Sequence, residues 1–214
     1  MVPHSFIYGG ETISVYINNH SLLVYHPVKV QETFETLKRT NTGEPFPFWA
    51  KIWPASKAVC LFIDAYKEIF NGKNVLEVAA GLAIPSLMVA KAGNPKKIIA
   101  TDYLNCVLPY ITENAGLNNV SVDAEIYNWE NLPPYKDIDI LILSDVNYSP
   151  EAFPHVMALI KHFIALKAMV ILSTPQRITA VQFIDLLSEY IQLQETYRTD
   201  GIDISVFVLL DNTR

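Results

Sequence analysis

The chain has 214 residues, of which 50% are hydrophobic, 11% aromatic and 18% charged. This composition supplies enough apolar side chains for a full core, and it excludes intrinsic disorder, collagen-like repeats and coiled coils. The formal net charge of −6 argues against a protein that binds duplex nucleic acid, because such a protein needs a face rich in lysine and arginine. No apolar run is long enough to span a membrane and no leader sequence opens the chain, so we expect a cytoplasmic protein that contacts no membrane.

The first 42 residues are predicted to form a small β-rich extension. Apolar side chains alternate loosely with polar ones between positions 13 and 24, which is typical of a hairpin or meander. The extension could frame a substrate entrance or mediate pairing between chains, and the sequence leaves the oligomeric state open. Residues 41–54 hold three prolines and two tryptophans, so this stretch is irregular and marks a change of architecture.

Residues 43–214 are predicted to form one domain in which helices and strands alternate. The expected strands cover residues 74–78, 97–101, 120–126, 138–144, 169–173 and 205–210. The expected helices cover residues 56–71, 85–91, 106–115, 151–166 and 180–190. Pro109 is tolerated only near a helix start, so the third helix should begin just before it.

The hydrophobic pattern also predicts how the strands are arranged. Residues 140–143 and 169–172 are apolar on both faces, as in strands that helices cover on each side, and this favours a mostly parallel sheet. Residues 191–197 and 204–210 are joined by a connection too short for a crossover helix, so they should pair antiparallel. The sequence therefore predicts a Rossmann-like, doubly wound α/β fold with three layers (α/β/α) and a C-terminal antiparallel hairpin.

No metal site and no disulfide framework are expected. Cys60 and Cys106 both fall within apolar helical patterns, where a cysteine acts as a small buried hydrophobic residue. The five histidines are scattered and form no HxxxH or HExxH pair.

In an open α/β sheet, ligands bind beyond the carboxyl ends of the strands, so the residues that follow each strand are the candidates. The turn after the first predicted strand contains Gly81 and Pro85 and lacks the GxGxxG pattern of a dinucleotide loop. It better suits a ligand without phosphates, whose carboxylate can meet the helix N-terminus. Asp102, at the end of the second strand, either binds a ribose diol or caps the next helix, and its spacing does not separate these roles.

Several of these strand ends resemble motifs of the class I methyltransferases that depend on S-adenosylmethionine (SAM). The matching segments are VLEVAAGLA at 75–83, ATDY at 100–103, YNWEN at 127–131 and SDVNY at 144–148. Together with PFWAKIWPAS at 47–56, they are similar to the seven-β-strand lysine methyltransferases. The nearest subgroup contains the lysine methyltransferase of the electron-transfer-flavoprotein β-subunit and its bacterial homologues. The resemblance spans residues 45 to 183.

The resemblance implies SAM as cofactor and direct methyl transfer to the neutral amine of a lysine in a protein substrate. It implies a cofactor site formed by Trp53, Glu77, Ala79, Ala80, Gly81, Asp102, Tyr103, Asn128, Trp129 and Ser144. Glu77 and the backbone of residues 79–81 would face the methionine end, and Asp102 the ribose. Asn128 and Trp129 would flank the adenine, and Trp53 would close over the cofactor.

The resemblance further implies two catalytic residues, Asp145 and Tyr148, at the entrance for the methyl acceptor. A carboxylate raises the pKa of a neighbouring amine, so Asp145 is not expected to act simply as the deprotonating base. We expect it to orient the incoming ammonium and to stabilise positive charge as that charge moves to nitrogen. Tyr148 would align the amine by a hydrogen bond.

Other interpretations stay open. Trp53 and Trp129 could be core aromatics with hydrogen-bonded indoles, and Arg177, after the fifth strand, is expected at the surface, although it could steady a carboxylate. The same scaffold could methylate a small amine or an N-heterocycle. Ala79 and Ala83 replace the first and third glycines of the family loop, and alanine at a positive φ would strain it. A non-catalytic binding module with a degenerate loop is therefore the third alternative.

Overall fold

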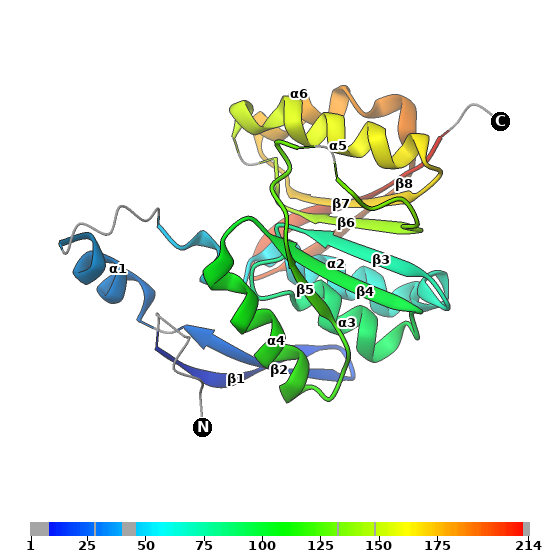
Figure 1. The fold of residues 1–214 in the computed structure, drawn as a ribbon. Helices are drawn as coiled ribbons and strands as arrows, with labels where there is room; N and C mark the ends of the chain where they lie inside the picture. The colour runs from blue at the N-terminus through cyan, green and yellow to red at the C-terminus, as the bar shows by residue number, and fades with distance from the viewer. Residues whose placement is uncertain (1–8, 28, 40–45, 132, 148, 212–214) are drawn as a thin grey trace.

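The computed structural model describes residues 9–27, 29–39, 46–131, 133–147 and 149–211, which form two β-sheets and the helices around them (Figure 1). The small sheet pairs β1 (Gly10–Ile17) with β2 (His20–Pro27) in antiparallel register. The strands of the large sheet are β3 (Asn74–Val78), β4 (Lys97–Asp102), β5 (Asp123–Ile126), β6 (Ile140–Ser144), β7 (Met169–Pro175), β8 (Ile191–Thr199) and β9 (Ile202–Leu209).

The large sheet has the strand order β5-β4-β3-β6-β7-β9-β8. The strands from β5 to β7 pair in parallel, whereas β9 pairs antiparallel with both β7 and β8. The parallel core and the terminal hairpin are both as predicted. The chain builds the sheet outward from β3 to β5 and then returns to β6, so its direction reverses between β3 and β6.

Helices cover both faces of the large sheet (Figure 1). The covering helices are α2 (Pro54–Ala65), α3 (Ile84–Ala92), α4 (Leu108–Leu117), α5 (Phe153–Ala165) and α6 (Ile178–Asp185), while α1 (Val30–Arg39) lies beside the small sheet (Figure 1). Short 3₁₀ turns are η1 (Phe48–Ala50), η2 (Lys67–Phe70), η3 (Asn105–Val107), η4 (Pro150–Ala152) and η5 (Ser188–Tyr190). Pro109 stands in the first turn of α4, as predicted, where no intrahelical N–H is lost.

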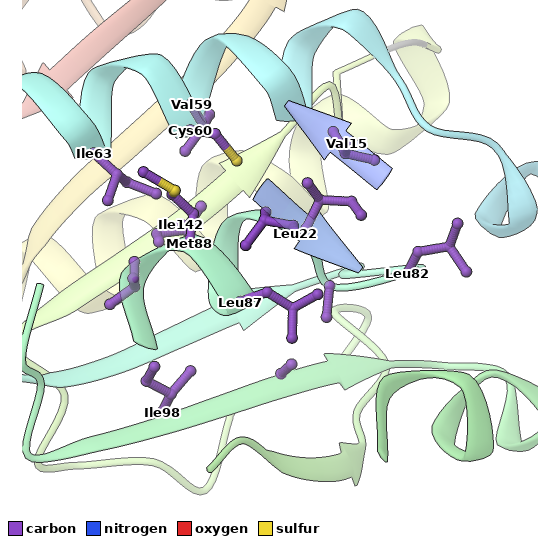
Figure 2. Close-up of a cluster of buried hydrophobic side chains, with 14 of the residues drawn as sticks. Val15, Leu22, Val59, Cys60, Ile63, Leu82, Leu87, Met88, Ile98 and Ile142 are labelled. Carbon is purple, nitrogen blue, oxygen red and sulfur yellow. The ribbon is translucent and has the colours of Figure 1, made fainter. Parts of the chain in front are cut away.

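Two apolar cores lie on opposite faces of the sheet because successive side chains of a strand point to opposite sides. Val75 on β3 belongs to the core shared with α2, α3 and α4, while Leu76 belongs to the core shared with α5 and α6. Figure 2 shows the first core, in which Val15 and Leu22 of the small hairpin join side chains of α2 and α3. The hairpin is thus packed onto the helices instead of standing apart.

Polar contacts hold the hairpin in place. The Asn114 Oδ1 on α4 accepts the Tyr25 N–H at 2.7 Å, and Asn118, the C-cap residue of α4, exchanges hydrogen bonds with both backbone groups of Leu23 at 2.9 and 2.6 Å. At the other end, Asp64 of α2 accepts a hydrogen bond of 2.6 Å from Asn18 in the hairpin turn. The backbone of β2 that would otherwise form an open sheet edge is therefore paired with side chains of α4.

Five boundaries or elements differ from the prediction, and the structure explains the first two. The β-rich extension ends in a helix, α1, whose Val30 and Phe34 lie one turn apart on one face. Helix α2 begins at Pro54 and not after Ser56, because proline suits the first helical position. β5 begins at Asp123 and β6 at Ile140, later than predicted, and α6 ends at Asp185 before a 3₁₀ turn. Within the described part of the chain, no helix is long and apolar enough to cross a membrane.

Candidate active site

The carboxyl ends of β3, β4, β6 and β7 meet at one edge of the large sheet, because these strands run in parallel. The chain leaves β3 toward β4 and leaves β6 toward β7, so the two connections run in opposite directions along the sheet. Such a switch point is where open α/β sheets bind ligands. The predicted site residues that the structure describes lie at or just after the carboxyl ends of β3, β4, β5 and β6, or precede α2.

The loop between β3 and α3 adopts an unusual backbone conformation. Ala79, Gly81 and Ala83 all have a positive φ, of 56°, 52° and 58°, so the strain expected for the two alanines is present. A Cβ atom at Gly81 would lie 2.7 Å from the Trp49 carbonyl oxygen, so this position has no room for a side chain. The Ala80 N–H donates to the Thr101 carbonyl of β4 at 2.8 Å, and this bond fixes the loop against the neighbouring strand.

Glu77 is buried at the end of β3, with 1% of its surface exposed. Its Oε2 accepts hydrogen bonds from the Ser86 hydroxyl at 2.5 Å and the Ser86 N–H at 2.9 Å. Burial raises the pKa of Glu77 to about 7, although the bonds from Ser86 oppose this change. The carboxyl group therefore ties β3 to the first turn of α3, and its contact with the methionine end of a cofactor stays a prediction.

Asp102 ends β4 with 4% of its surface exposed. Its Oδ2 accepts the Gly81 N–H at 3.2 Å and its Oδ1 accepts the Leu104 N–H at 3.1 Å. Burial raises the pKa of Asp102, and these backbone bonds act in the opposite direction. Asp102 does not cap α4 itself, whose N-cap is Val107. Its Oδ1 instead binds the N–H of Leu104, the N-cap residue of η3, which runs directly into α4, so a structural role at this helical start is present. The ribose role stays a prediction.

The loop after β5 lies beside Asp102. The Tyr127 N–H donates to the Asp102 carbonyl at 3.0 Å, so the residues that follow β5 are tied to the end of β4. Trp129 is half-buried and packs against the core under α5 and α6. Asn128 accepts the Glu130 N–H at 3.0 Å within its own turn. Tyr103 is more than half exposed at this end of the sheet, next to Asp102.

Two tryptophans lie before α2. The half-buried Trp53 donates its indole N–H to the Phe48 carbonyl at 3.0 Å, and the Lys51 ammonium lies 4.3 Å from its ring centroid. The hydrogen-bonded indole of the structural interpretation is thus present, and closure over a cofactor stays a prediction. Trp49, which the sequence did not single out, is buried with its ring centroid 4.7 Å from that of Tyr110. Its carbonyl abuts Gly81, so η1 supports the loop from behind.

Asp145 follows β6 with a positive φ of 54°, and its side chain is 11% exposed. Its N–H donates to the Ser173 carbonyl of β7 at 2.8 Å. The carboxylate forms an ion pair with the guanidinium of Arg177, the N-cap residue of α6. Arg177 is half-buried, with 34% of its side chain exposed, and it steadies a carboxylate, that of Asp145, because the adjacent ends of β6 and β7 bring the two side chains together.

Buried polar atoms without a hydrogen-bond partner gather at this same end of β6. Among the residues that the structure describes, they are the Ser144 Oγ, both side-chain polar atoms of Asn147 and the Arg177 Nε. Native proteins leave few such atoms, and each calls for an explanation such as a ligand or bound water. Tyr148, the second predicted catalytic residue, lies outside the described residues. In the described ranges no group of three or more His, Cys, Asp or Glu side chains could hold a metal.

Comparison with known proteins agrees with this arrangement. The family model described as lysine methyltransferase matches residues 37–190, which is more than half of the chain. Over 172 residues the chain is 26% identical to the protein N-lysine methyltransferase METTL21A of Danio rerio, covering 76% of this chain and 78% of that protein. Over 117 residues it is 30% identical to the histone-arginine methyltransferase METTL23 of Mus musculus, covering 50% of this chain and 44% of that protein.

A solved structure shares the fold over nearly the whole chain. The tRNA (uracil-54, C5)-methyltransferase of Pyrococcus abyssi, in complex with S-adenosyl-L-homocysteine, matches with a TM-score of 0.60 and 14% identity. The match covers 95% of this chain and 45% of that chain. The chain therefore belongs to the lysine methyltransferase family, and its activity is that of a methyltransferase that uses SAM.

Proposed function

We propose that this enzyme transfers a methyl group from SAM to the side-chain amine of a lysine in a protein substrate. The observation that carries the proposal is the arrangement at the switch point, where Asp102 ends β4, the β3–α3 loop follows β3 and Asp145 follows β6, at the ends of three adjacent strands. The family model and the likeness to METTL21A, which extends over three quarters of both chains, support lysine as the acceptor.

The residues at the strand ends fit a cofactor of this kind. The β3–α3 loop carries no lysine or arginine and has Pro85 in the first turn of α3, so it suits a ligand without phosphates. The Asp102 carboxylate has about four lone-pair sites. The backbone N–H groups of Gly81, Leu104 and Tyr103 bind to it, so it can still accept a hydrogen bond from a ribose hydroxyl. We infer that Trp53, Asn128 and Trp129 complete the site, with Glu77, Ala79, Ala80, Tyr103 and Ser144 around them.

SAM supplies an activated methyl group on a sulfonium, and the task of the chain is to deliver a neutral amine to it. A free lysine has a pKa of about 10.4, so its deprotonation at pH 7 costs roughly 4–5 kcal/mol. Asp145 receives the ammonium and stabilises the positive charge that nitrogen acquires in the transition state. Ser144 and Asn147, whose oxygens are buried, can accept the N–H bonds of the bound amine. Tyr148 is the proposed aligning residue.

The test is to incubate the purified protein with SAM labelled in its methyl group and a protein extract. After acid hydrolysis of the protein fraction, we expect the label in N-methyllysine. Label in methylarginine would favour the acceptor of METTL23, and label in a low-mass extract would indicate a small-molecule methyltransferase. A protein that binds no SAM in a calorimetric titration would be the non-catalytic module.

A matched pair of variants tests the role of Asp145. Asp145→Asn should lower turnover by roughly a hundred-fold while SAM affinity stays unchanged, because the charge in the transition state loses its partner. Asp203→Asn, at an exposed carboxylate paired with Arg198, is the control and should retain full turnover. Full turnover by Asp145→Asn would show that the proposed role is wrong.

A further inference from the structure

The charge of Asp145 presents a problem for an amine methyltransferase. A carboxylate within about 4–6 Å of an amine favours the ammonium form and raises its pKa. The ammonium has no lone pair and cannot attack a methyl group. An unbalanced Asp145 would therefore bind the acceptor well and hold it in the unreactive protonation state.

The structure provides a counter-charge at the same atom. Arg177 enters from the N-terminal end of α6 and contacts Asp145 Oδ1 with its Nη2, in a region where the carboxylate is only 11% exposed. A guanidinium keeps its charge throughout the range in which a lysine titrates. Burial lowers the pKa of Arg177, and the adjacent carboxylate favours its charged form. The pair as a whole therefore carries no net charge.

We propose that Arg177 is a positioning residue that neutralises Asp145, so that the acceptor lysine can lose its proton where it meets the cofactor. This inference rests on the proposed function and deepens it. In the balanced site, the neutral amine is held by uncharged acceptors, the buried Oγ of Ser144 and Oδ1 of Asn147, neither of which has a partner in the described ranges. Asp145 still lies close enough to stabilise the charge that appears on nitrogen during transfer.

Other charged groups do not balance Asp145. The charged and titratable groups on the surrounding elements are Lys57 and Asp64 on α2, Glu77 on β3, Lys97 and Asp102 on β4, Glu151 in η4, His155, Lys161 and His162 on α5, Asp185 on α6 and Asp203 on β9. In the part of the chain that the structure describes, none of them forms an ion pair with Asp145 or Arg177. Lys57 and Asp203 are paired elsewhere, with Asp200 at 2.8 Å and Arg198 at 2.9 Å.

A second role for Arg177 would have the opposite consequence. If the guanidinium only blocked Asp145, it would occupy the place of the incoming ammonium, and its removal would open the site. The enzyme would then turn over faster without Arg177. Charge balance predicts slower turnover at neutral pH together with tighter binding of the charged acceptor, so kcat and KM fall together.

The experiment measures kcat from pH 6.5 to 10.5, with saturating SAM and a synthetic peptide that contains the lysine identified by the labelling assay. The kcat profile is used because it reports the amine in the bound complex. In Arg177→Gln, the acid limb of the kcat profile should shift to higher pH by about one to two units. This is the change expected in the pKa of the bound amine when one charge about 6 Å away is lost. At pH 7, kcat should fall roughly ten- to a hundred-fold, and KM should fall as well.

Two further variants keep the test decisive. Arg177→Lys retains the charge and should keep the acid limb of the wild type, which distinguishes charge from packing. Arg198→Gln removes an exposed arginine from an ion pair on β8 and should change neither kcat nor its pH dependence. An unshifted limb in a folded Arg177→Gln, or a higher kcat, would overturn the inference while the proposed function stood. A wild-type enzyme that forms no methyllysine would overturn the proposed function and, with it, this inference.

Discussion

At the scale of single residues, the β3–α3 loop combines close backbone packing with local strain. Only Gly81 faces a backbone carbonyl that excludes a side chain, whereas Ala79 and Ala83 have room for their methyl groups but lie in the left-handed region. That conformation costs a residue with a Cβ atom roughly 1 kcal/mol. The alanines therefore lower the stability of the loop without preventing its shape from forming.

Replacing Ala79 with glycine should stabilise the protein. Ala79 is half-buried, so its methyl group contributes little packing, and relief of the strain should raise the free energy of unfolding by about 0.5–1 kcal/mol. In a chain of this size, thermal unfolding would shift upward by roughly 2–4 °C per kcal/mol. Ala80→Gly is the matched control, because Ala80 is equally half-buried but has no positive φ, and it should be destabilising. Equal effects of the two substitutions would contradict the assignment of strain.

The burial of Glu77 should make stability depend on pH. Its pKa is about 7 in the folded protein and about 4.5 when exposed, so the folded state binds the proton more tightly. Stability from this group is therefore complete below pH 4.5 and is lost as the pH rises to 7, by roughly 3 kcal/mol in total. Glu77→Gln keeps an uncharged acceptor for Ser86 and should abolish this loss. Denaturant unfolding of both proteins between pH 5 and 8 measures it; parallel pH profiles would show that the pKa of Glu77 is not raised.

At the scale of elements, the hydrophobic pattern predicted the parallel strands best. Ile140–Leu143 and Val170–Leu172 are apolar on both faces, and only a strand between two helical layers buries both. Helix α1 was not predicted from the sequence, because the helix comes shortly after a stretch with a strand pattern. Its apolar stripe is buried by residues distant in the sequence, and a local pattern does not show such packing. The division of the chain at residue 43 stays a prediction, and the hairpin before it shares the core of α2 and α3.

The attachment of this hairpin should depend on Asn114. Its side chain is buried, accepts the Tyr25 N–H at 2.7 Å and donates to the Leu82 carbonyl at 3.2 Å. Asn114→Ala removes both of these buried hydrogen bonds and should lower the free energy of unfolding by about 2–3 kcal/mol. Hydrogen exchange at the Tyr25 amide should accelerate. Thr112→Ala, at an exposed position of the same helix, should change stability by less than about 0.5 kcal/mol; an equal loss there would indicate a general weakening of α4.

At the scale of the whole molecule, the topology determines which site residues the sequence can predict. Asp102 and Asp145 directly follow apolar strands, so the rule for strand ends places both at the switch point. The pairing of Asp145 with Arg177 could not be predicted, because it depends on the adjacency of β6 and β7 and on the N-terminal end of α6. The support of Gly81 by Trp49 likewise joins segments more than thirty residues apart, which no local pattern reveals.

A crystal structure with S-adenosylhomocysteine and the methyl-acceptor peptide would test the account most directly. We predict that the ribose hydroxyls bind the carboxylate of Asp102 and that the acceptor nitrogen lies beside Asp145 while Arg177 keeps its ion pair. A ligand bound away from the ends of β3 and β4, or an Asp102 carboxylate without contact to the sugar, would contradict the account.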